Sequence, residues 1–289
     1  MNIFFSGNLI SVSRDKSIKI YNNNLEIIQN IPNAHNSDIN YIQIIDENNF
    51  VTCSNDKSIK IWNKKDNKFI VNQTIENAHN RVILKVLHCS NGDLISGSIE
   101  GQINIWKKKN NLKKFNDEIN NQLNNNDSLW DLLLLEDKNM FISGGENGII
   151  LWNYNPNNID PNKISKILSI NELDCKWNNS MCRLDDDRII INGSINSLKV
   201  ISIDKKKIIK EIENPFLCLG IKLIKNKEIF LVGGKKIYDI RIYNSDNYEY
   251  IDTIENAHDD NIFGFVELKD GRIASYSDDA KIKIWEFNI

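Results

Sequence analysis

Short stretches in which apolar and polar residues alternate recur along the chain, with polar turns between them. Residues 9–13 and 17–21 show this alternation, and so do residues 50–54 and 58–62. A period of two residues is typical of a β-strand with one buried face, and a short polar turn between two such runs indicates a hairpin. After each hairpin a second polar turn leads to one more alternating run, such as 250–254. The pattern therefore predicts repeated antiparallel units.

One spacing recurs three times, because three histidines each stand 27 residues before a tryptophan. A serine follows each of these histidines by 19 residues and an acidic residue by 21. A period of roughly 40 to 45 residues that ends in tryptophan is typical of the four-stranded blade of a β-propeller. The three sets are His35, Ser54, Asp56 and Trp62; His79, Ser98, Glu100 and Trp106; and His258, Ser277, Asp279 and Trp285.

Alignment on the closing residue of each unit gives seven units. Asn125, Asp174 and Asn214 stand at the histidine position in the fourth, fifth and sixth units, where we expect the polar network to be lost. The predicted fold is an all-β, seven-bladed propeller in a single domain, 1–289. Neither terminus offers a spare strand, so we expect three strands in the last blade. The approximate blades are 1–31, 32–75, 76–119, 120–170, 171–213, 214–255 and 256–289.

The repeated sets resemble those of the WD40 family of β-propellers, and the resemblance covers essentially the whole chain. In that family the histidine precedes the innermost strand, the serine lies on the second strand, the acid in the next turn and the tryptophan on the third strand. All four are hydrogen-bonded in a row. The resemblance implies that each set stabilises one blade. The Gly-His pair of the family is replaced by Ala-His, at Ala34, Ala78 and Ala257.

Composition narrows the possible functions. The net charge is −3 and the pI is near 5.9, so there is no basic stripe of the kind that nucleic-acid binding needs. The 5 cysteines form no C-x-x-C pair and suit a reducing compartment. No apolar run is long enough to span a bilayer. We therefore expect a cytoplasmic protein, with a nuclear location as the alternative, and neither a cofactor nor a metal.

In a propeller, the loops that lead into the innermost strands and the turns between the second and third strands share one face around the central channel. We call this the channel-mouth face. Trp130 and Trp177 map to it and are the two tryptophans that the repeat does not explain. Exposed tryptophans often dominate binding, although both could instead pack between blades. The residues predicted for this face are Trp130, Trp177, Phe263, Arg14, Arg81, Asp38, Asn40 and Leu84.

The predicted function is a non-catalytic protein–protein interaction scaffold that binds peptide or protein partners on this face, as a monomer within a larger complex. One alternative is a substrate-receptor subunit of a cullin-type ubiquitin ligase, because residues 238–241 loosely resemble a Trp-Asp-x-Arg box. The register argues against it, since that box follows the third strand. The other alternative is a propeller enzyme of the lactonase or hydrolase kind, which rests on fold analogy alone. The common nucleophile and phosphate-loop motifs are absent from the sequence.

Overall fold

In the computed structural model, chain contacts divide the protein into two compact units. Unit 1 comprises residues 1–143 and 150–167, and unit 2 comprises residues 144–149 and 168–289. The assignment of all 289 residues to one domain stays a prediction. The structure describes residues 1–4, 6–108, 115, 121–125, 127–146, 148–155, 164–170, 180–193, 196–236 and 238–287.

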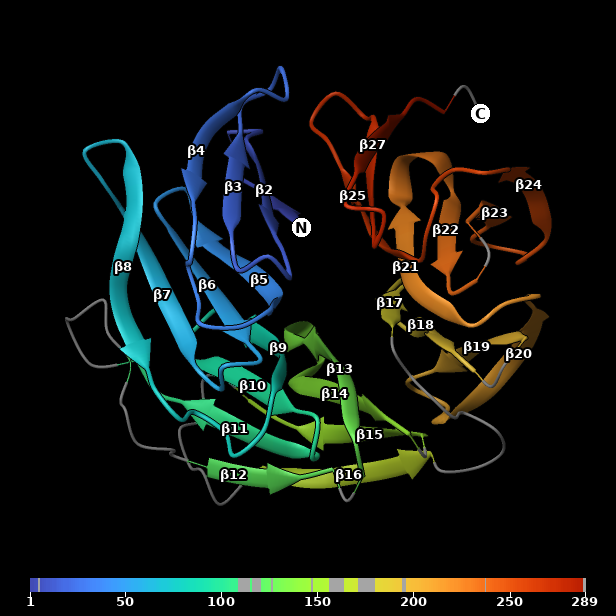
Figure 1. Ribbon diagram of the computed structural model, residues 1–289. Helices are drawn as coiled ribbons and strands as arrows, with labels where there is room; N and C mark the ends of the chain where they lie inside the picture. Colours follow the sequence, from blue (N-terminus) through green and yellow to red (C-terminus); the bar gives the residue numbers. More distant parts are fainter. Residues whose placement is uncertain are drawn as a thin grey trace. The chain divides into compact units, whose positions relative to one another are not determined.

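Unit 1 holds three complete antiparallel sheets and most of a fourth, each a meander of four strands in chain order (Figure 1). The fourth strand of the third sheet, β12, follows the approximate blade boundary at residue 119. The strands are β1 (Asn2–Ile3), β2 (Leu9–Val12), β3 (Ile18–Tyr21) and β4 (Ile27–Ile31); β5 (Ile39–Asp46), β6 (Asn49–Ser54), β7 (Ile59–Lys65) and β8 (Lys68–Ile75); β9 (Ile83–His88), β10 (Leu94–Ser98), β11 (Gln102–Trp106) and β12 (Asn121–Asn124); and β13 (Leu129–Leu135), β14 (Met140–Gly145), β15 (Gly148–Asn153) and β16 (Ser165–Ile170).

Unit 2 holds two further four-stranded sheets and a last sheet of three strands. Seven sheets make the chain an all-β, seven-bladed propeller, so the predicted fold class and the three-stranded last blade are confirmed. The strands are β17 (Met181–Arg183), β18 (Arg188–Asn192), β19 (Ser197–Ser202) and β20 (Lys207–Glu213); β21 (Cys218–Ile224), β22 (Ile229–Gly234), β23 (Ile240–Asn244) and β24 (Tyr250–Ile254); and β25 (Ile262–Glu267), β26 (Ile273–Ser277) and β27 (Ile282–Trp285).

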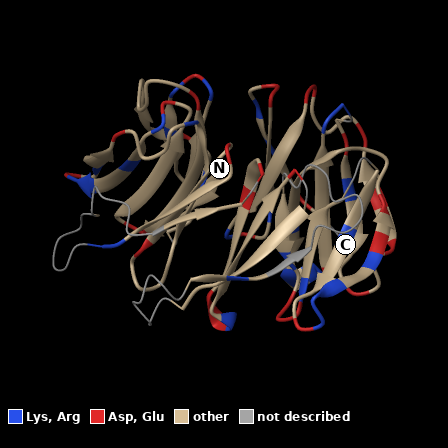
Figure 2. Cartoon of the chain, turned by 90° about the horizontal axis from the view of Figure 1, so that it is seen from below, with Lys and Arg blue, Asp and Glu red and all other residues tan. Residues whose placement is uncertain are grey.

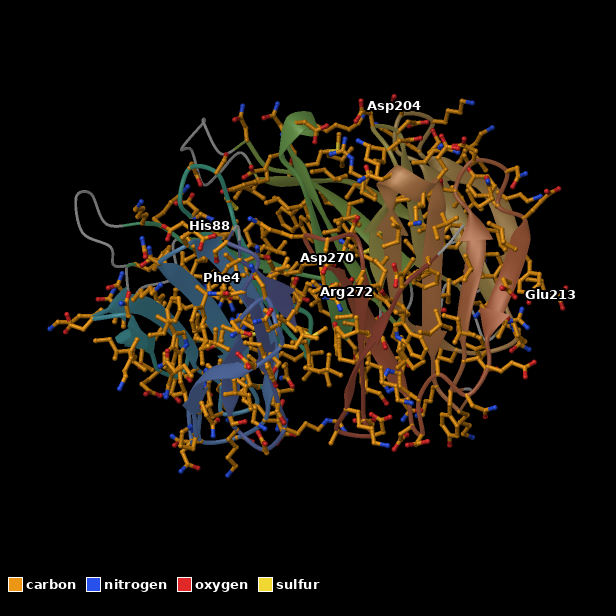
Figure 3. All side chains as sticks on the ribbon, turned by 90° about the horizontal axis from the view of Figure 1, so that it is seen from above. Phe4, His88, Asp204, Glu213, Asp270 and Arg272 are labelled. Carbon is orange, nitrogen blue, oxygen red and sulfur yellow. The ribbon has the colours of Figure 1, made fainter. Side chains whose placement is uncertain are left out.

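Aromatic side chains fill the space between the first and second blades in unit 1. Phe50 stacks on Trp62 with ring centroids 5.6 Å apart, and Phe4 stacks on Phe69 at 5.3 Å. Phe50 also contacts Phe69 at 5.0 Å. Figure 3 shows Phe4 among the strands of this unit. Because such rings bury large apolar areas, this cluster joins neighbouring blades into one core.

Asparagine explains how the loops before the innermost strands do without the glycine of the family pattern. Asn33, Asn77 and Asn256 each stand two residues before a repeat histidine and adopt positive φ angles of 51°, 50° and 51°. Asparagine tolerates this left-handed conformation better than most residues. In the Asn-Ala-His sequence the positive φ angle therefore falls on asparagine, so the residue before the histidine does not need to be glycine.

Candidate functional site

A buried hydrogen-bond network surrounds His35 in the second blade. His35 Nε2 lies 2.8 Å from Thr52 Oγ1, and Trp62 Nε1 donates to the same oxygen at 2.9 Å. On its other side, His35 Nδ1 lies 3.0 Å from Asp56 Oδ2. Ser58 Oγ donates to Asp56 Oδ1 at 2.7 Å. The histidine thus connects the carboxylate of a turn to the tryptophan of the third strand.

The hydroxyl between histidine and tryptophan is not the serine assigned from the sequence. It is Thr52 in the second blade, where Ser54 was assigned. Ser54 instead accepts from the Asp56 N–H at 3.0 Å and closes the turn. Residues i and i+2 of a strand share one face, so the spacing rule found the correct face but the wrong residue. The same difference of two residues holds in the other sets, where Ser96 replaces Ser98 and Ser275 replaces Ser277.

In the third blade the acid assigned from the sequence does not contact the histidine. Glu100 is exposed, and His79 Nδ1 lies instead 3.3 Å from Gln102 Oε1. Glutamate is one methylene longer than aspartate, so its carboxylate does not fit the short turn that Asp56 closes in the second blade. The third blade therefore pairs its buried histidine with a neutral amide.

The network is reduced in the fourth blade but not lost, contrary to the expectation from sequence. Asn125 occupies the histidine position and accepts from Ser143 Oγ at 2.5 Å. Trp152 Nε1 donates to Ser143 Oγ at 2.7 Å. In the sixth blade, Tyr243 OH donates to Asn214 Oδ1 at 3.3 Å. Asparagine can thus accept from the neighbouring hydroxyl in place of the imidazole.

Burial and partners shift the pKa values of these groups. Burial alone would raise the pKa of Asp56 and of Asp279, but hydrogen bonds from His35 and Ser58 hold that of Asp56 well below its usual range. For Asp279, the Asp259 N–H and His258 lower the pKa to about 2. Burial lowers the pKa of His79 to about 4, because no carboxylate contacts its ring. The histidine of the third blade is therefore neutral at physiological pH.

This difference predicts an acid-sensitive third blade. The pKa of His79 is about 4 when folded and near 6.5 when unfolded, so the unfolded chain takes up the proton first. Stability present above pH 6.5 should therefore fall as the pH drops toward 4, by at most about 3 kcal/mol. In Gln102→Glu a carboxylate would favour the imidazolium, and we expect a smaller loss. Urea unfolding at several pH values between 7 and 4.5 measures the loss of stability in the parent protein and in Gln102→Glu.

The matched control is Glu100→Gln, which removes an exposed carboxylate from the same turn and should leave the pH dependence unchanged. The pKa of His88, at the end of β9 (Figure 3), is also lowered by burial. Protonation of His88 contributes equally to the pH dependence of stability in the parent protein, Gln102→Glu and Glu100→Gln. Comparison of the three proteins therefore isolates the contribution of His79. Equal pH dependence in Gln102→Glu and the parent protein would contradict the assignment of Gln102 as the partner.

Most residues predicted for the channel-mouth face lie in unit 1, where β5 packs beside β9 and β9 beside β13. Arg14 lies between β2 and β3, and Arg81 lies just before β9; both are exposed. Asp38 precedes β5 directly. The other three were placed in loops by the repeat but belong to the innermost strands themselves, because these strands begin earlier than expected. These are Asn40 on β5, Leu84 on β9 and Trp130 on β13, all half-buried.

Backbone hydrogen bonds hold these loops in place. The Asn55 N–H donates to Asp38 O at 2.9 Å, and the Ile99 N–H donates to Val82 O at 3.1 Å. Asn40 Nδ2 donates to Asn55 Oδ1 and, in the next blade, to Ile83 O, both at 2.7 Å. Each loop is thus fixed by the turn of its own blade, and Asn40 also joins two blades. The loops and strand starts of this predicted face are therefore held by hydrogen bonds within the chain.

A row of polar side chains on the innermost strands was not predicted. Lys85 Nζ on β9 lies 2.6 Å from Asp131 Oδ1 on β13. The same Nζ lies 4.1 Å from the ring centroid of Tyr41 on β5. The three residues occupy one repeat position in successive blades. Because the side chains of Lys85 and Asp131 are only 18% and 7% exposed, this row connects three blades rather than offering a free charge.

The remaining predicted residues lie elsewhere. Phe263 is half-buried on β25 in unit 2. Trp177 lies outside the described residues. Asp239 Oδ1 accepts from the Asn256 N–H at 2.7 Å, and the guanidinium of Arg241 on β23 lies 5.3 Å from the ring of Tyr250. Asp239 and Arg241 therefore take part in contacts within unit 2, and the ubiquitin-ligase alternative gains no support from the geometry.

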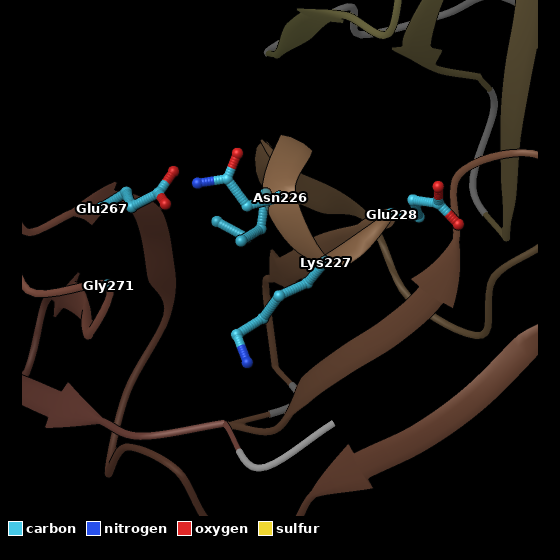
Figure 4. Close-up of a pocket in the computed structure, with 6 residues that line it drawn as sticks. Asn226, Lys227, Glu228, Glu267 and Gly271 are labelled. Atoms are coloured by element: carbon cyan, nitrogen blue, oxygen red, sulfur yellow. The ribbon is translucent and has the colours of Figure 1, made fainter.

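Other surface features of the described residues add no second site. Charges of both signs gather mainly at the turns (Figure 2). A hollow in unit 2 is lined by polar groups that include Asn226, Lys227 and Glu267 (Figure 4), but Lys227 Nζ donates to Phe287 O at 2.6 Å. The nearby turn is closed by Arg272, whose guanidinium lies 2.7 Å from Asp270 (Figure 3). In the described ranges no helix is long and apolar enough to cross a membrane.

Comparisons with known proteins agree with the repeat and the fold. The family model "WD domain, G-beta repeat" matches residues 26–63. The U3 small nucleolar RNA-associated protein 12 of Saccharomyces cerevisiae is 27% identical over 106 residues, which are 36% of this chain and 11% of that protein. The match thus spans about a tenth of that relative's length. The WD40 β-propeller domain of Doa1 superposes with a TM-score of 0.77 at 17% identity, over 99% of this chain and 91% of that one.

The matched repeat contains the first histidine, the closing Trp62 and the network between them. The structural likeness extends that blade to the rest of the fold. Propellers of this type generally act as non-catalytic scaffolds for protein interactions. By its repeat and its seven sheets, the chain is a seven-bladed β-propeller that contains a WD40 repeat and is similar in fold to WD40 β-propellers.

Proposed function

We propose that the chain is a non-catalytic interaction platform that binds a peptide or protein on the channel-mouth face of unit 1. The observation that carries this proposal is the grouping of Arg81, Leu84 and Trp130 at the beginning of neighbouring innermost strands. The backbone bonds of Asp38 and Val82 hold the adjoining loops. A preorganised surface loses little conformational entropy on binding, which favours affinity.

The chemistry of the face suits an acidic segment with an apolar residue beside its charge. Arg81 is exposed and can form a bidentate pair with a carboxylate or a phosphate. Leu84 and Trp130 are half-buried, so each retains apolar surface for a partner to cover. Aromatic residues that are partly packed and partly open are frequent hot spots in interfaces. The partner segment is therefore an extended or turn peptide with an acid next to a large apolar side chain.

The proposal includes a monomeric platform within a larger assembly. The yeast relative is associated with a small nucleolar RNA by its name. This chain has a net charge of −3, and a surface of mixed sign does not favour direct binding to phosphate backbones. In an RNA-associated assembly, as in any other, the channel-mouth face would therefore contact protein. Among the described residues no group of three or more His, Cys, Asp or Glu could hold a metal, and a catalytic role has no observation in its favour.

Trp130→Ala is the decisive substitution. If Trp130 is a binding anchor, partner affinity should fall by about 2 kcal/mol or more, which is about 30-fold, while the melting temperature changes little. Affinity purification with the parent protein identifies the partner, and titration calorimetry with the purified partner measures the change.

Val71→Ala serves as the matched control, because Val71 is an apolar residue that is 42% exposed on the outer strand β8. It should leave both affinity and melting temperature unchanged. A large fall in the melting temperature of Trp130→Ala together with unchanged affinity would show that Trp130 packs between blades. In that case the channel-mouth assignment would have to be abandoned.

A further inference from the structure

The last blade lacks the fourth strand that covers the third strand in the other blades. In unit 2, β27 pairs with β26 on one side and with no described strand of that unit on the other. Alternate residues of an edge strand direct N–H and C=O groups away from the sheet. Ile282, Ile284 and Trp285 are all half-buried. Their counterparts in the second blade, beneath β8, are Ile59, Ile61 and Trp62, which are 0%, 3% and 2% exposed.

The complete blades show what kind of strand fits this position. In the first, second, fifth and sixth blades, the fourth strand places an isoleucine opposite the aliphatic residue that precedes a cation on the third strand, and a polar residue opposite that cation. It also places a large apolar residue opposite the closing position. The third blade departs from the pattern, because Ile103 faces Leu123 and no cation follows it. The five-residue segments with this pattern are 27–31, 71–75, 208–212 and 250–254, paired with 18–21, 59–62, 198–201 and 240–243.

The charges along β27 further restrict the partner. Lys281 Nζ is already paired with Asp259 at 2.5 Å. Lys283 occupies the position of Lys199 in the fifth blade, which faces Glu211 on its fourth strand. An acid opposite Lys283 would reproduce that cross-strand pair, which is a stabilising arrangement in antiparallel sheets. Among the segments above, residues 208–212 have this acidic variant of the pattern.

We propose that the open edge of β27 binds an extended segment of a partner protein, which adds as the fourth strand of the last blade. From its N-terminus, the segment contains in order a large apolar residue, a residue of any type, a polar residue, an acidic residue and an isoleucine. The apolar residue faces Trp285, the acid faces Lys283 and the isoleucine faces Ile282. Backbone hydrogen bonds hold the strand, and the side chains select its sequence. This surface is separate from the channel-mouth face and does not depend on the function proposed above.

A synthetic peptide that copies residues 206–214 of the chain tests the proposal with the full-length protein. Fluorescence anisotropy should show saturable binding. Hydrogen exchange should show new protection at residues 282–285 and none at β3, which β4 covers. A peptide N-methylated at alternate residues should not bind, because it cannot form the ladder. A peptide with lysine in place of the acid should bind about tenfold more weakly.

Variants of the protein complete the test. Lys283→Glu should weaken binding of the parent peptide about tenfold and restore binding of the lysine peptide. The matched control is Lys19→Glu, at the same position of the complete first blade, which should leave binding unchanged. If Lys283→Glu does not fold, the affinities of the parent peptide and the lysine peptide for the parent protein still test the effect of the charge opposite Lys283. Absence of binding, protection away from β27, or self-association of the chain through β27 in sedimentation would each overturn the proposal.

Discussion

Thr52→Val is expected to destabilise the protein by about 3 kcal/mol, whereas Ser54→Ala is expected to remove only about 1 kcal/mol. Valine keeps the shape of threonine but leaves His35 Nε2 and Trp62 Nε1 without their shared partner. Each buried polar group left unsatisfied costs about 1–3 kcal/mol. Ser54 bonds instead to the Asp56 N–H in its own turn and, at 3.3 Å, to Ser37 O in the loop before β5. Urea unfolding monitored by tryptophan fluorescence compares the two variants.

The last blade offers an independent repetition of this comparison. Ser275 bridges His258 and Trp285 at 2.6 and 2.7 Å, and Ser277 occupies the turn position. Ser275→Ala should therefore be more destabilising than Ser277→Ala. A larger loss from Ser54→Ala than from Thr52→Val, or the same reversal in the last blade, would show that the bridging hydroxyl has been assigned wrongly.

Gly101→Ala is expected to be at least as damaging, with a loss of about 3 kcal/mol or more. Gly101 has a φ of +85°, and an added Cβ would lie 2.1 Å from the backbone oxygen of Asp127 in the loop before β13. A left-handed conformation costs a residue with a Cβ roughly 1–2 kcal/mol, and overpacking adds about 1–3 kcal/mol. The Asn125 N–H also donates to Gly101 O at 2.8 Å, so relief of the clash would disturb that bond. Thermal and urea unfolding measure the loss.

Gly271 provides the matched control. Its φ is also +85°, but a Cβ there would meet nothing within 4 Å. Gly271→Ala should therefore show the conformational strain alone, about 1–2 kcal/mol. The difference between the losses in free energy of unfolding of the two variants gives the effect of the contact between the turn of the third blade and the loop of the fourth. Equal losses at the two glycines would mean that this contact does not stabilise the protein.

The sequence was sufficient for the fold because each blade repeats one arrangement of strands and turns, and most blades end in a closing aromatic. It was not sufficient for the network inside a blade. Thr52 and Ser54 alternate with the same period and share a face, so spacing alone could not choose between them. The hydrogen-bonding roles of Gln102 and Asn125 were missed for another reason. Both are neutral amides that replace a charged or ring partner, and a search for histidine and acid does not detect them.

For the candidate site, too, the sequence predicted the position of a residue in the repeat but not the contacts that form between blades. The repeat frame placed Asn40, Leu84 and Trp130 correctly along the chain, but it assigned them to loops because the start of a strand has no sharp sequence signal. The contacts among Tyr41, Lys85 and Asp131 could not be foreseen. They join side chains of three blades, and a partner more than 40 residues away along the chain is visible only after the blades have packed.

Site-specific photo-crosslinking tests the central claim most directly. A photoreactive amino acid is placed at position 81 or 84 on the channel-mouth face, and, for comparison, at position 28 or 71 on the exposed outer strands β4 and β8. The purified partner should crosslink from positions 81 and 84 and not from 28 or 71, and Trp130→Ala should abolish the product. Crosslinking mainly from positions 28 and 71, unaffected by Trp130→Ala, would contradict the assignment of the channel-mouth face as the binding surface.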